Sequence, residues 1–327
     1  MKRNLVYCYE NDKPQSVRSF LKEHGYPKKL ICLFKQDPSL IQKNSQPVML
    51  RDLLKKGDVL AVSFCDETFS PNILPAAPKN PQDLKIVYED EDVIVCDKPA
   101  KVPVHPSQNH RSDSLANFLA MRFQKENNPF VFRCLNRLDL DTSGLVLIAK
   151  NALSAAVLQA ELRNRQLRRT YTAIAAGKIE HDETIDLPIA RKADSVILRC
   201  VDPIRGVKAV THLHPLCCEK DRTLLAISLE TGRTHQIRVH LSHEGHPLLG
   251  DPFYGLDILK DYSCSIRRQA LHSCRLSFYH PVSKKKILLT SAPPEDFQKE
   301  LSFRQRGALQ DFLHLDGHTA ESDLPVV

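Results

Sequence analysis

The sequence predicts an α+β protein built in two unequal parts. Helix-like and strand-like segments are interspersed along its 327 residues without the regular spacing of strand–helix–strand units, which argues against a doubly wound parallel sheet. An almost unbroken apolar run, Leu145 to Ala149, follows Gly144 and is typical of a strand with both faces buried. A proline-rich stretch, residues 66–82, predicts an extended linker between a small amino-terminal part and a larger second part.

The pattern of residues 1–65 predicts two short helices followed by small strands. Val17, Phe20 and Leu21 recur at helical spacing, and a turn containing glycine and proline interrupts that pattern before a second apolar stripe resumes it. After Gly57, successive side chains are expected to alternate between the two faces of a short strand. We therefore expect a small α+β module at the amino terminus.

The second part, residues 83–300, is predicted to open with two strands joined by an acidic turn. Asp113 or Ser114 is placed to cap a helix that follows. Another helix, a basic bend and a strand come after the apolar run, and residues 190–230 are mostly strand-like. The segment THQIRVHLSHEG predicts a helix with Gly245 just beyond its end.

Composition narrows the class of protein. The 42% of hydrophobic and 26% of charged residues are ordinary for a globular chain, and its length suits two domains. The first residues lack the apolar core of a secretion signal, and no uncharged apolar stretch approaches membrane-spanning length. Ten cysteines without regular spacing are expected to be reduced thiols. We expect a cytoplasmic monomer that does not engage a membrane.

Charge is distributed unevenly along the chain. Residues 1–65 carry 12 Lys or Arg against 6 Asp or Glu, an excess of six positive charges in a chain whose net charge is +7. Such a module suits a polyanionic partner, most often nucleic acid, although a solvated lysine-rich surface explains the same excess. From residue 307 onward there are four acids and no Lys or Arg, and we expect residues 301–327 to form an acidic tail.

A polar segment, NRLDLDTS, lies directly before the buried strand. Two interpretations compete for its Arg137, Asp139 and Asp141. These side chains either satisfy a turn or place a carboxylate and a guanidinium for chemistry on a rigid base. This segment alone favours the turn, because loops commonly use Asp and Ser to cap the backbone.

Motifs for several chemistries are absent. The chain has no GxxxxGK[ST], GxGxxG, GxSxG or HExxH, so nucleotide hydrolysis, dinucleotide redox chemistry and zinc proteolysis have no sequence support. Two groups of potential ligands lack the paired spacing of a structural zinc site: His212, His214, Cys217 and Cys218, and then His235, His240, His243 and His246. We expect neither a metal nor a nucleotide or other cofactor.

A second polar cluster lies at a predicted strand-to-helix junction. In ETGRTHQIRVH, this cluster consists of Arg233, His235, Gln236 and Arg238. Helix amino termini readily receive anions and carboxylates, although taken alone this cluster also fits a structural junction.

Together these segments resemble the RluA family of pseudouridine synthases. RLDLDTSGLVLIAK is similar to the family's signature around its catalytic aspartate, RRTYTA to the segment with its active-site tyrosine, and TGRTHQIRVH to the segment with its active-site arginine. DKPAKVPVHPS, HPLLGDPFYG and RRQALHSCRLSFYHP extend the resemblance over about residues 83–295. Residues 1–65 resemble the αL RNA-binding module that often precedes this catalytic domain.

The resemblance implies a pseudouridine synthase fold, with a mixed, mainly antiparallel sheet flanked by helices, and an enzyme that isomerises uridines in structured RNA. Asp139 is then the essential carboxylate, which either bonds to the ribose or removes a sugar proton. Tyr171 would stack on the uracil and serve the proton removal at C5, and Ile237 would contact the base from below. Arg233 would be the active-site arginine whose charge keeps Asp139 ionised. Asp141 is expected to be a structural neighbour.

The same resemblance implies how RNA is held. The target uridine must leave its stack, and Arg137 would fill the vacated space. A basic cluster would bind phosphates: Arg163, Arg165, Arg168 and Arg169. The amino-terminal module makes large-subunit ribosomal RNA the first candidate substrate and transfer RNA the second.

Two positions depart from the family pattern, and two other functions stay open. Asn136 stands where the family usually has His and cannot carry a charge, and Lys101 stands where it usually has Gly. A non-catalytic RNA-binding or ribosome-associated protein on the same fold is the first alternative. A hydrolase of glycosidic or nucleosidic bonds is the second, and it requires another carboxylate to activate water.

Overall fold

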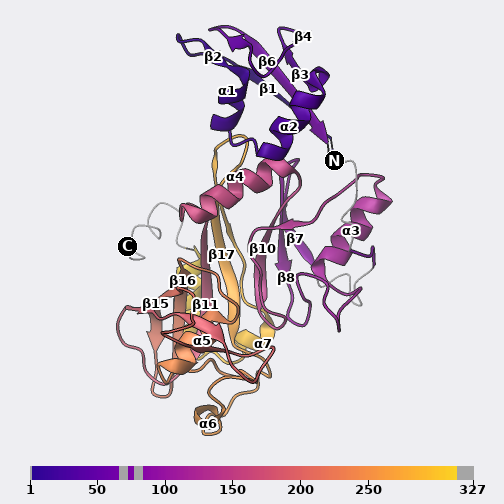
Figure 1. Cartoon of the computed structure of the whole chain (residues 1–327). Helices are drawn as coiled ribbons and strands as arrows, with labels where there is room; N and C mark the ends of the chain where they lie inside the picture. The colour runs from indigo at the N-terminus through magenta and orange to yellow at the C-terminus, as the bar shows by residue number, and fades with distance from the viewer. Residues whose placement is uncertain (1, 66–72, 77–83, 315–327) are drawn as a thin grey trace.

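A computed structural model describes residues 2–65, 73–76 and 84–314. Figure 1 shows a small amino-terminal module above one end of a long sheet, with helix α4 (Ala152–Arg163) lying between the two. The α+β class predicted from the sequence is confirmed.

The amino-terminal module contains the two predicted helices packed on short strands, but two of the strands come before the helices, which the sequence pattern did not predict. Its elements are β1 (Lys2–Cys8), β2 (Gln15–Ser16), α1 (Val17–Glu23), α2 (Lys28–Gln36), the 3₁₀ helix η1 (Pro38–Leu40), β3 (Ile41–Lys43), β4 (Gln46–Pro47), β5 (Leu53–Leu54) and β6 (Val59–Cys65). The sheet order is β1-β6-β3-β4, and β2 pairs with β5. Val17 and Leu21 of α1 are fully buried in the module's own apolar core.

Helix α4 joins this module to the rest of the chain. Its Leu153 and Val157 are buried in the core of the module. Arg3 of β1 forms a bidentate ion pair with the buried carboxylate of Asp92, with Nε 3.1 Å from Oδ1 and Nη2 2.7 Å from Oδ2. Removing either side chain would leave an unpaired charge in a partly buried contact, which destabilises the protein. The pair therefore stabilises the position of the module against the larger part of the chain.

Asp90, Asp92 and His280, beside this joint, bring possible metal-binding atoms within 4.8 Å of one another, the one such group among the described residues. The backbone N–H groups of residues 282 and 283 donate to Nδ1 of His280. Its proton is therefore on Nε2, which lies 2.8 Å from the Asp90 carboxylate. Since Arg3 already neutralises Asp92, these side chains form an internal network of the joint.

The larger part is built on a ten-stranded sheet. Its elements are β7 (Lys85–Glu89), β8 (Val93–Lys98), α3 (Leu115–Lys125), β9 (Arg133–Cys134), β10 (Ser143–Ala149), α4, β11 (Arg168–Ala176), β12 (Glu183–Asp186), β13 (Ile189–Arg191), β14 (Arg199–Val201), β15 (Val210–Cys218), β16 (Arg222–Leu229), α5 (Gln236–His243), α6 (Leu256–Leu259), β17 (Leu271–Tyr279), β18 (Lys286–Thr290), α7 (Glu295–Gln298) and α8 (Phe303–His314). The main path is β12-β15-β16-β11-β17-β10-β8-β7, with β18 on β17 and β9 on β10. Strands β10 and β17 run parallel and the other described pairs of this sheet are antiparallel, so the predicted mixed, mainly antiparallel sheet is confirmed.

Alternation along the central strands assigns each helix to a face of the sheet. Every residue of β10 is buried, as the apolar run predicted. On β11, Tyr171 and Ala173 belong to the core that includes side chains of α3 and α5, whereas Ile174 and Ala176 belong to the core that includes Leu309 of α8. The α3 and α5 face carries the pocket described below, and α8 covers the opposite face.

The structure corrects the expected carboxy-terminal tail. Within residues 301–327, helix α8 buries Leu309 and Phe312 against the sheet, so this stretch is part of the folded core. Residues 315–327 lie outside the described residues. Most of the expected linker also lies outside them, and Asn117 of α3 donates a 2.6 Å hydrogen bond to the carbonyl of Leu74 within it. No helix in the described ranges has the length and apolar character needed to cross a bilayer.

Candidate active site

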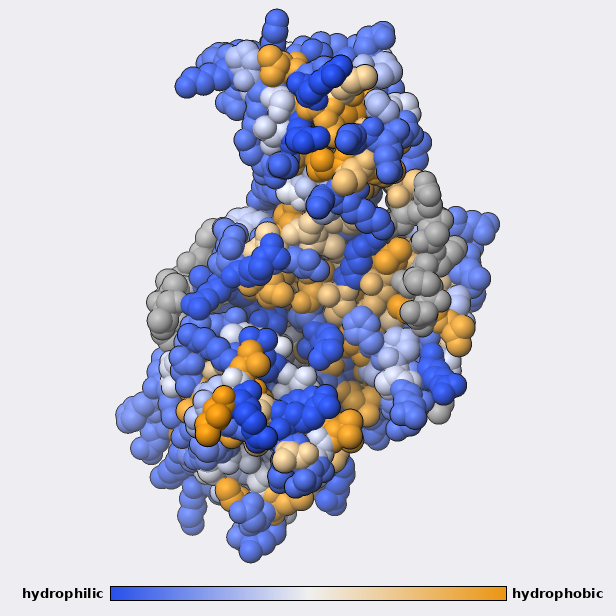
Figure 2. Space-filling model, viewed as in Figure 1, coloured by the Kyte–Doolittle hydropathy of each residue, from blue (hydrophilic) through white to orange (hydrophobic). Residues whose placement is uncertain are grey.

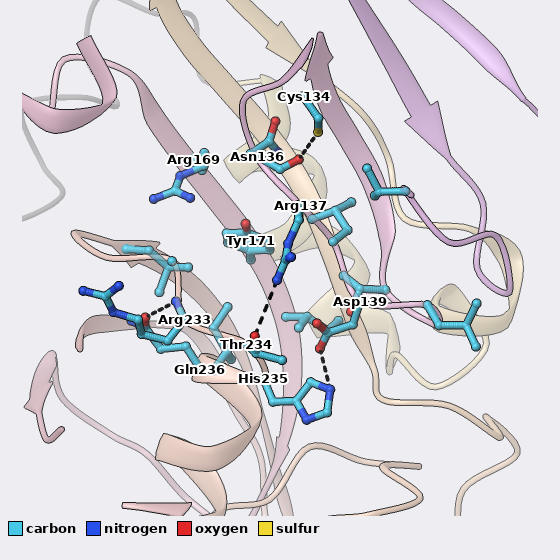
Figure 3. Close-up of a pocket in the computed structure, with 18 of the residues that line it drawn as sticks. Cys134, Asn136, Arg137, Asp139, Arg169, Tyr171, Arg233, Thr234, His235 and Gln236 are labelled. Carbon is cyan, nitrogen blue, oxygen red and sulfur yellow. Dashed lines mark hydrogen bonds and ion pairs between the residues drawn. The ribbon is translucent and has the colours of Figure 1, made fainter. Parts of the chain in front are cut away.

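The segments singled out in the sequence meet around one pocket of about 670 Å³. Its wall is formed by the loop before β10, by β11, and by the turn that leads into α5 (Figure 3). Six of the predicted site residues line it: Arg137, Asp139, Arg169, Tyr171, Arg233 and Ile237. The seventh, Arg168, does not line it, because neighbouring residues of β11 point to opposite faces.

Asp139 stands on a loop that is fastened to β10 behind it. Buried Asn136 accepts the backbone N–H of Leu147 at 2.8 Å and donates to the carbonyl of Leu145 at 3.0 Å. The backbone N–H of Thr142 donates to the carbonyl of Asp139 and closes the turn. A neutral side chain with one donor and one acceptor satisfies this position, so Asn136 needs no charge to hold the loop.

Buried Lys98 fastens the same loop from below. Its Nζ donates to the carbonyls of Pro99, Val102 and Leu140, at 2.9, 2.7 and 3.1 Å. Burial lowers the pKa of Lys98 to about 7, against the opposing charges of Asp139 and Asp141. This lysine lies in the DKPA stretch, and no feature of the sequence alone assigned it a role.

The guanidinium beside Asp139 belongs to Arg238. Its Nη1 lies 3.3 Å from Oδ2 of Asp139, while Nε and Nη2 bind the two oxygens of Asp251 at 2.7 and 2.9 Å. Burial opposes the charge of Arg238, but the bonds to Asp251 and the charges of both carboxylates outweigh burial and raise its pKa. Arg238 is therefore a fixed cation between two acids.

The expectation that Arg233 holds the charge of Asp139 is wrong for this structure. The exposed Arg233 lines the rim of the pocket, and its Nε donates to the carbonyl of Lys208 at 3.0 Å. Both arginines lie in TGRTHQIRVH, but α5 begins at Gln236, so Arg238 projects from the first helical turn into the buried side. The sequence pattern predicts this helix but does not show which arginine, Arg238 within it or Arg233 before it, reaches Asp139.

His235 lies in the turn before α5 and lines the pocket. Its backbone is left-handed, with φ 59°, and its Nε2 lies 3.9 Å from Oδ2 of Asp139. The Tyr254 hydroxyl accepts from the Arg199 backbone and lies 2.8 Å from Nδ1 of His235, so it is placed to donate to this nitrogen. Burial lowers the pKa of His235 despite Asp139, and the charges of Arg238 and Arg199 lower it further. A neutral ring therefore faces Asp139 at neutral pH.

Tyr171 and Ile237 give the pocket an apolar wall. Both belong to the main core, with 4% of each residue exposed, and both line the pocket. Burial raises the pKa of Tyr171, opposed by the charge of Arg169, so its phenol keeps its proton at neutral pH. The pair offers a flat aromatic face and an aliphatic side chain to a planar ligand.

Two arginines lie at the polar edge of the pocket. Exposed Arg137 has Nη2 at 3.5 Å from the Thr234 hydroxyl, across the mouth (Figure 3). Arg169 is 7% exposed, and its buried Nε has no partner within the described residues. A Cβ on Gly232 would lie 3.0 Å from Nη1 of Arg169, so the glycine leaves room for this guanidinium.

The chain is similar to known proteins over most of its length. A family model described as RNA pseudouridylate synthase matches residues 92–243. An uncharacterized RNA pseudouridine synthase of Bacillus subtilis, YjbO, is 39% identical over 285 residues, which are 87% of this chain and 97% of that protein. The ribosomal large subunit pseudouridine synthase D of Buchnera aphidicola is 38% identical over 242 residues, 71% of this chain and 77% of that one.

A solved structure extends the likeness to the fold. The human RNA pseudouridylate synthase domain containing 1 matches with a TM-score of 0.51 at 26% identity, over 64% of this chain and 84% of that one. The family model and these relatives show that the chain belongs to the family of RNA pseudouridine synthases, which are isomerases that act on RNA.

Proposed function

We propose that this enzyme converts specific uridines of large-subunit ribosomal RNA to pseudouridine, with Asp139 as the essential carboxylate. The observation that carries the proposal is the position of Asp139. Its side chain is one-quarter exposed in the pocket, paired with Arg238, in the same cavity as the aromatic face of Tyr171.

The reaction requires a carboxylate that stays ionised in a sheltered site. Pseudouridine formation breaks the bond between ribose and uracil N1, turns the base and rejoins it through C5, without net oxidation. Asp139 either bonds to the electron-poor sugar carbon or removes a sugar proton, and both routes need its negative charge. Arg238 places a positive charge 3.3 Å from this carboxylate, while Asp251 holds Arg238 from the other side.

Tyr171 and Ile237 are placed to hold the uracil while it turns. A stacked base is free to rotate in its own plane, whereas hydrogen bonds would fix one orientation. Because burial raises the pKa of Tyr171, its hydroxyl is neutral, so it takes up the C5 proton only while passing its own proton to a base, for which Asp139 is a carboxylate in the same pocket. At the mouth, Arg137 is positioned to occupy the space that the uridine leaves in its stack.

The contacts of Glu230 argue against a hydrolase. Among the residues that line the pocket, Glu230 is the other carboxylate besides Asp139. It is bound to Arg165 at 2.6 Å and to His212 at 3.1 Å, so it is not free to activate a water molecule. Asp141 does not line the pocket, and Arg268 binds its backbone carbonyl.

The choice of ribosomal RNA rests on the relatives and on the basic amino-terminal module. Several relatives carry the name ribosomal large subunit pseudouridine synthase D. Pseudouridines should be mapped across total RNA from cells with and without the gene, and after complementation with the wild type or with Asp139→Asn. We expect one or a few large-subunit sites to disappear and to return with the wild type alone. Sites lost from transfer RNA instead would correct the substrate, and an unchanged map would reject the proposal.

A further inference from the structure

A second groove, of about 410 Å³, continues from the rim of the active-site pocket. Arg233 and Thr234 line both cavities. The rest of the groove is formed by the two-stranded sheet of β13 and β14 and by the loop that follows it. Its remaining lining residues are Ile189, Ala190, Arg191, Arg199, Arg205 and Val207.

Four of the eight lining residues are arginines and none is acidic. An acid beside the groove, Asp202, pairs with Arg205 at 2.7 Å, and its carboxylate also accepts the backbone N–H groups of residues 204 and 205. Arg191 is exposed, its backbone pairs with that of Arg199, and its side chain has no hydrogen bond or ion pair within the described residues. Arg199 uses Nη1 to bind the carbonyls of Ile197 and Leu198. The groove thus concentrates positive charge beyond what its own fold neutralises.

The charge of the groove continues into the pocket. Arg169, with its unpaired Nε, lies over Gly232 beside Arg233 at the pocket end. At the groove end, Arg199 is close enough to His235 for its charge to help lower the pKa of that ring, after the larger effect of burial. Figure 2 shows the face over α5 as largely hydrophilic, with isolated apolar residues among the blue ones.

We infer that this groove binds phosphodiester groups of the RNA strand next to the uridine that enters the pocket. The inference rests on the proposed function and deepens it, since it assigns a path to the flanking nucleotides. Arginine forks match phosphate oxygens, and a row of them suits a polyanion more than a single anion. The shared rim residues place the groove within reach of a strand whose base occupies the pocket. Ile204, next to Arg205 in the chain, and Val196, in the loop between β13 and β14, are 92% and 79% exposed and add apolar surface for neighbouring bases.

The test compares charge-removing and charge-keeping variants of Arg191 and Arg205, which do not line the active-site pocket. The double variant Arg191→Ala/Arg205→Ala removes both cations, and Arg191→Lys/Arg205→Lys keeps them. Arg306→Ala is the matched control, because exposed Arg306 lies on α8, which covers the opposite face of the sheet. Binding of a short single-stranded oligouridine RNA is measured over a range of salt concentrations.

We expect the double alanine variant to bind oligouridine roughly tenfold more weakly, and the slope of log affinity against log salt to flatten by about 1.4, or 0.7 for each phosphate that the variant no longer neutralises. The lysine variant should keep most of the slope and Arg306→Ala all of it. On ribosomal RNA from cells lacking the gene, KM should rise while kcat is retained. An alanine variant with the slope of Arg306→Ala would overturn the inference.

Two further measurements distinguish an RNA path from a free-anion site and from a failure of the proposed function. At constant ionic strength, inorganic phosphate should displace oligouridine from the wild type no better than chloride does; displacement by phosphate but not by chloride, in the wild type and not in the double alanine variant, would show a free-anion site and contradict the RNA path. A wild type that binds RNA but forms no pseudouridine would reject the proposed function. The salt slopes would still decide whether the groove contacts phosphates.

Discussion

The guanidinium of Arg238 donates from Nη1 to Oδ2 of Asp139, 3.3 Å away. Its other edge is clamped by Asp251 through two shorter bonds, and 3% of the Arg238 side chain is exposed. Because Asp251 fixes the planar fork, the donor that meets Asp139 has a set direction. Asp139 is therefore both paired and oriented by one neighbour, on a loop that Asn136 and Lys98 hold in place.

Arg238→Lys should reduce turnover far more than Arg233→Lys. A lysine at position 238 has no planar fork, so it cannot hold Asp251 and direct a donor at Asp139 in the same geometry. We expect kcat to fall by about 100-fold or more, as for the loss of a fixed electrostatic donor. Arg233→Lys should change kcat by a few-fold at most and act mainly on KM. Tritium release from RNA labelled at uridine C5 measures both constants.

Asp251→Asn tests whether Arg238 acts through its orientation. This variant keeps the size of the side chain and removes the charge that anchors the guanidinium. It should lower kcat in the same direction as Arg238→Lys, and thermal unfolding of each variant reports the cost of disturbing a buried pair. If Arg233→Lys lost more kcat than Arg238→Lys, the assignment of the active-site arginine would return to Arg233.

Asp139→Asn should abolish pseudouridine formation while folding and RNA binding stay nearly intact. The amide keeps the size and hydrogen-bonding capacity of the side chain but removes its charge and nucleophilicity. If Asp139 only stabilised the turn, Asn would be tolerated, because Asn also serves in turns. Asp141→Asn is the control, since Asp141 does not line the pocket, and its effect should be far milder. Substantial C5 tritium release by Asp139→Asn would overturn the mechanism.

Local pattern predicted most of the fold, because each signal came from neighbouring residues. Burial of every residue in β10 follows from its apolar run, and Ser114 caps α3 as one of the two predicted residues. The prediction that Arg233 pairs with Asp139 was wrong for a different reason. Which arginine reaches Asp139 depends on where α5 begins and on the left-handed turn at His235. At this end of the helix, Gln236 and Arg238 are held by Val210 and Asp251 from other segments of the chain, and such contacts do not show in a local pattern.

Composition misled the prediction for the chain end. Counting charges after residue 307 indicated a solvated tail, yet Leu309 and Phe312 lie one helical turn apart and are both buried. The acids that suggested a tail lie largely beyond residue 314, outside the described residues. The helical spacing of apolar residues within 303–314 is the signal that could have found this helix.

Lys101→Gly should stabilise the protein by roughly 0.5 to 1 kcal/mol. Lys101 adopts φ 66°, in the left-handed region, which costs a residue with a Cβ about 1 to 2 kcal/mol. Glycine avoids this strain but loses more backbone entropy on folding, which offsets about half of the stabilisation. This explains why the family pattern has glycine here. Thermal unfolding should show a rise of a few degrees. The exposed Lys178 is outside the positive-φ residues, so Lys178→Gly should lower stability, and a loss in both variants would contradict the argument.

Buried His272 should make the protein lose stability as the solution becomes acidic. Its Nε2 donates to the carbonyl of Ser291 and its Nδ1 accepts from the hydroxyl of Ser143, so the native site holds a neutral ring behind the Asp139 loop. Burial lowers the pKa of His272 from 6.5 to about 3. Between these two values the unfolded chain binds a proton that the native state does not, so the free energy of unfolding falls as pH falls below 6.5.

The slope from this one residue is about 1.4 kcal/mol per pH unit, or about 2 kcal/mol between pH 6.5 and 5. His272→Gln keeps a donor and an acceptor but cannot gain a charge in this range, so it should be less stable than the wild type at about pH 7 and lose less stability on acidification. Urea unfolding at about pH 7, 6 and 5 measures the difference. His181→Gln, at an exposed position, serves as the control and should keep the wild-type slope. Equal slopes for His272→Gln and the wild type would mean that native His272 takes up a proton as readily as the unfolded chain does, contrary to its hydrogen bonds.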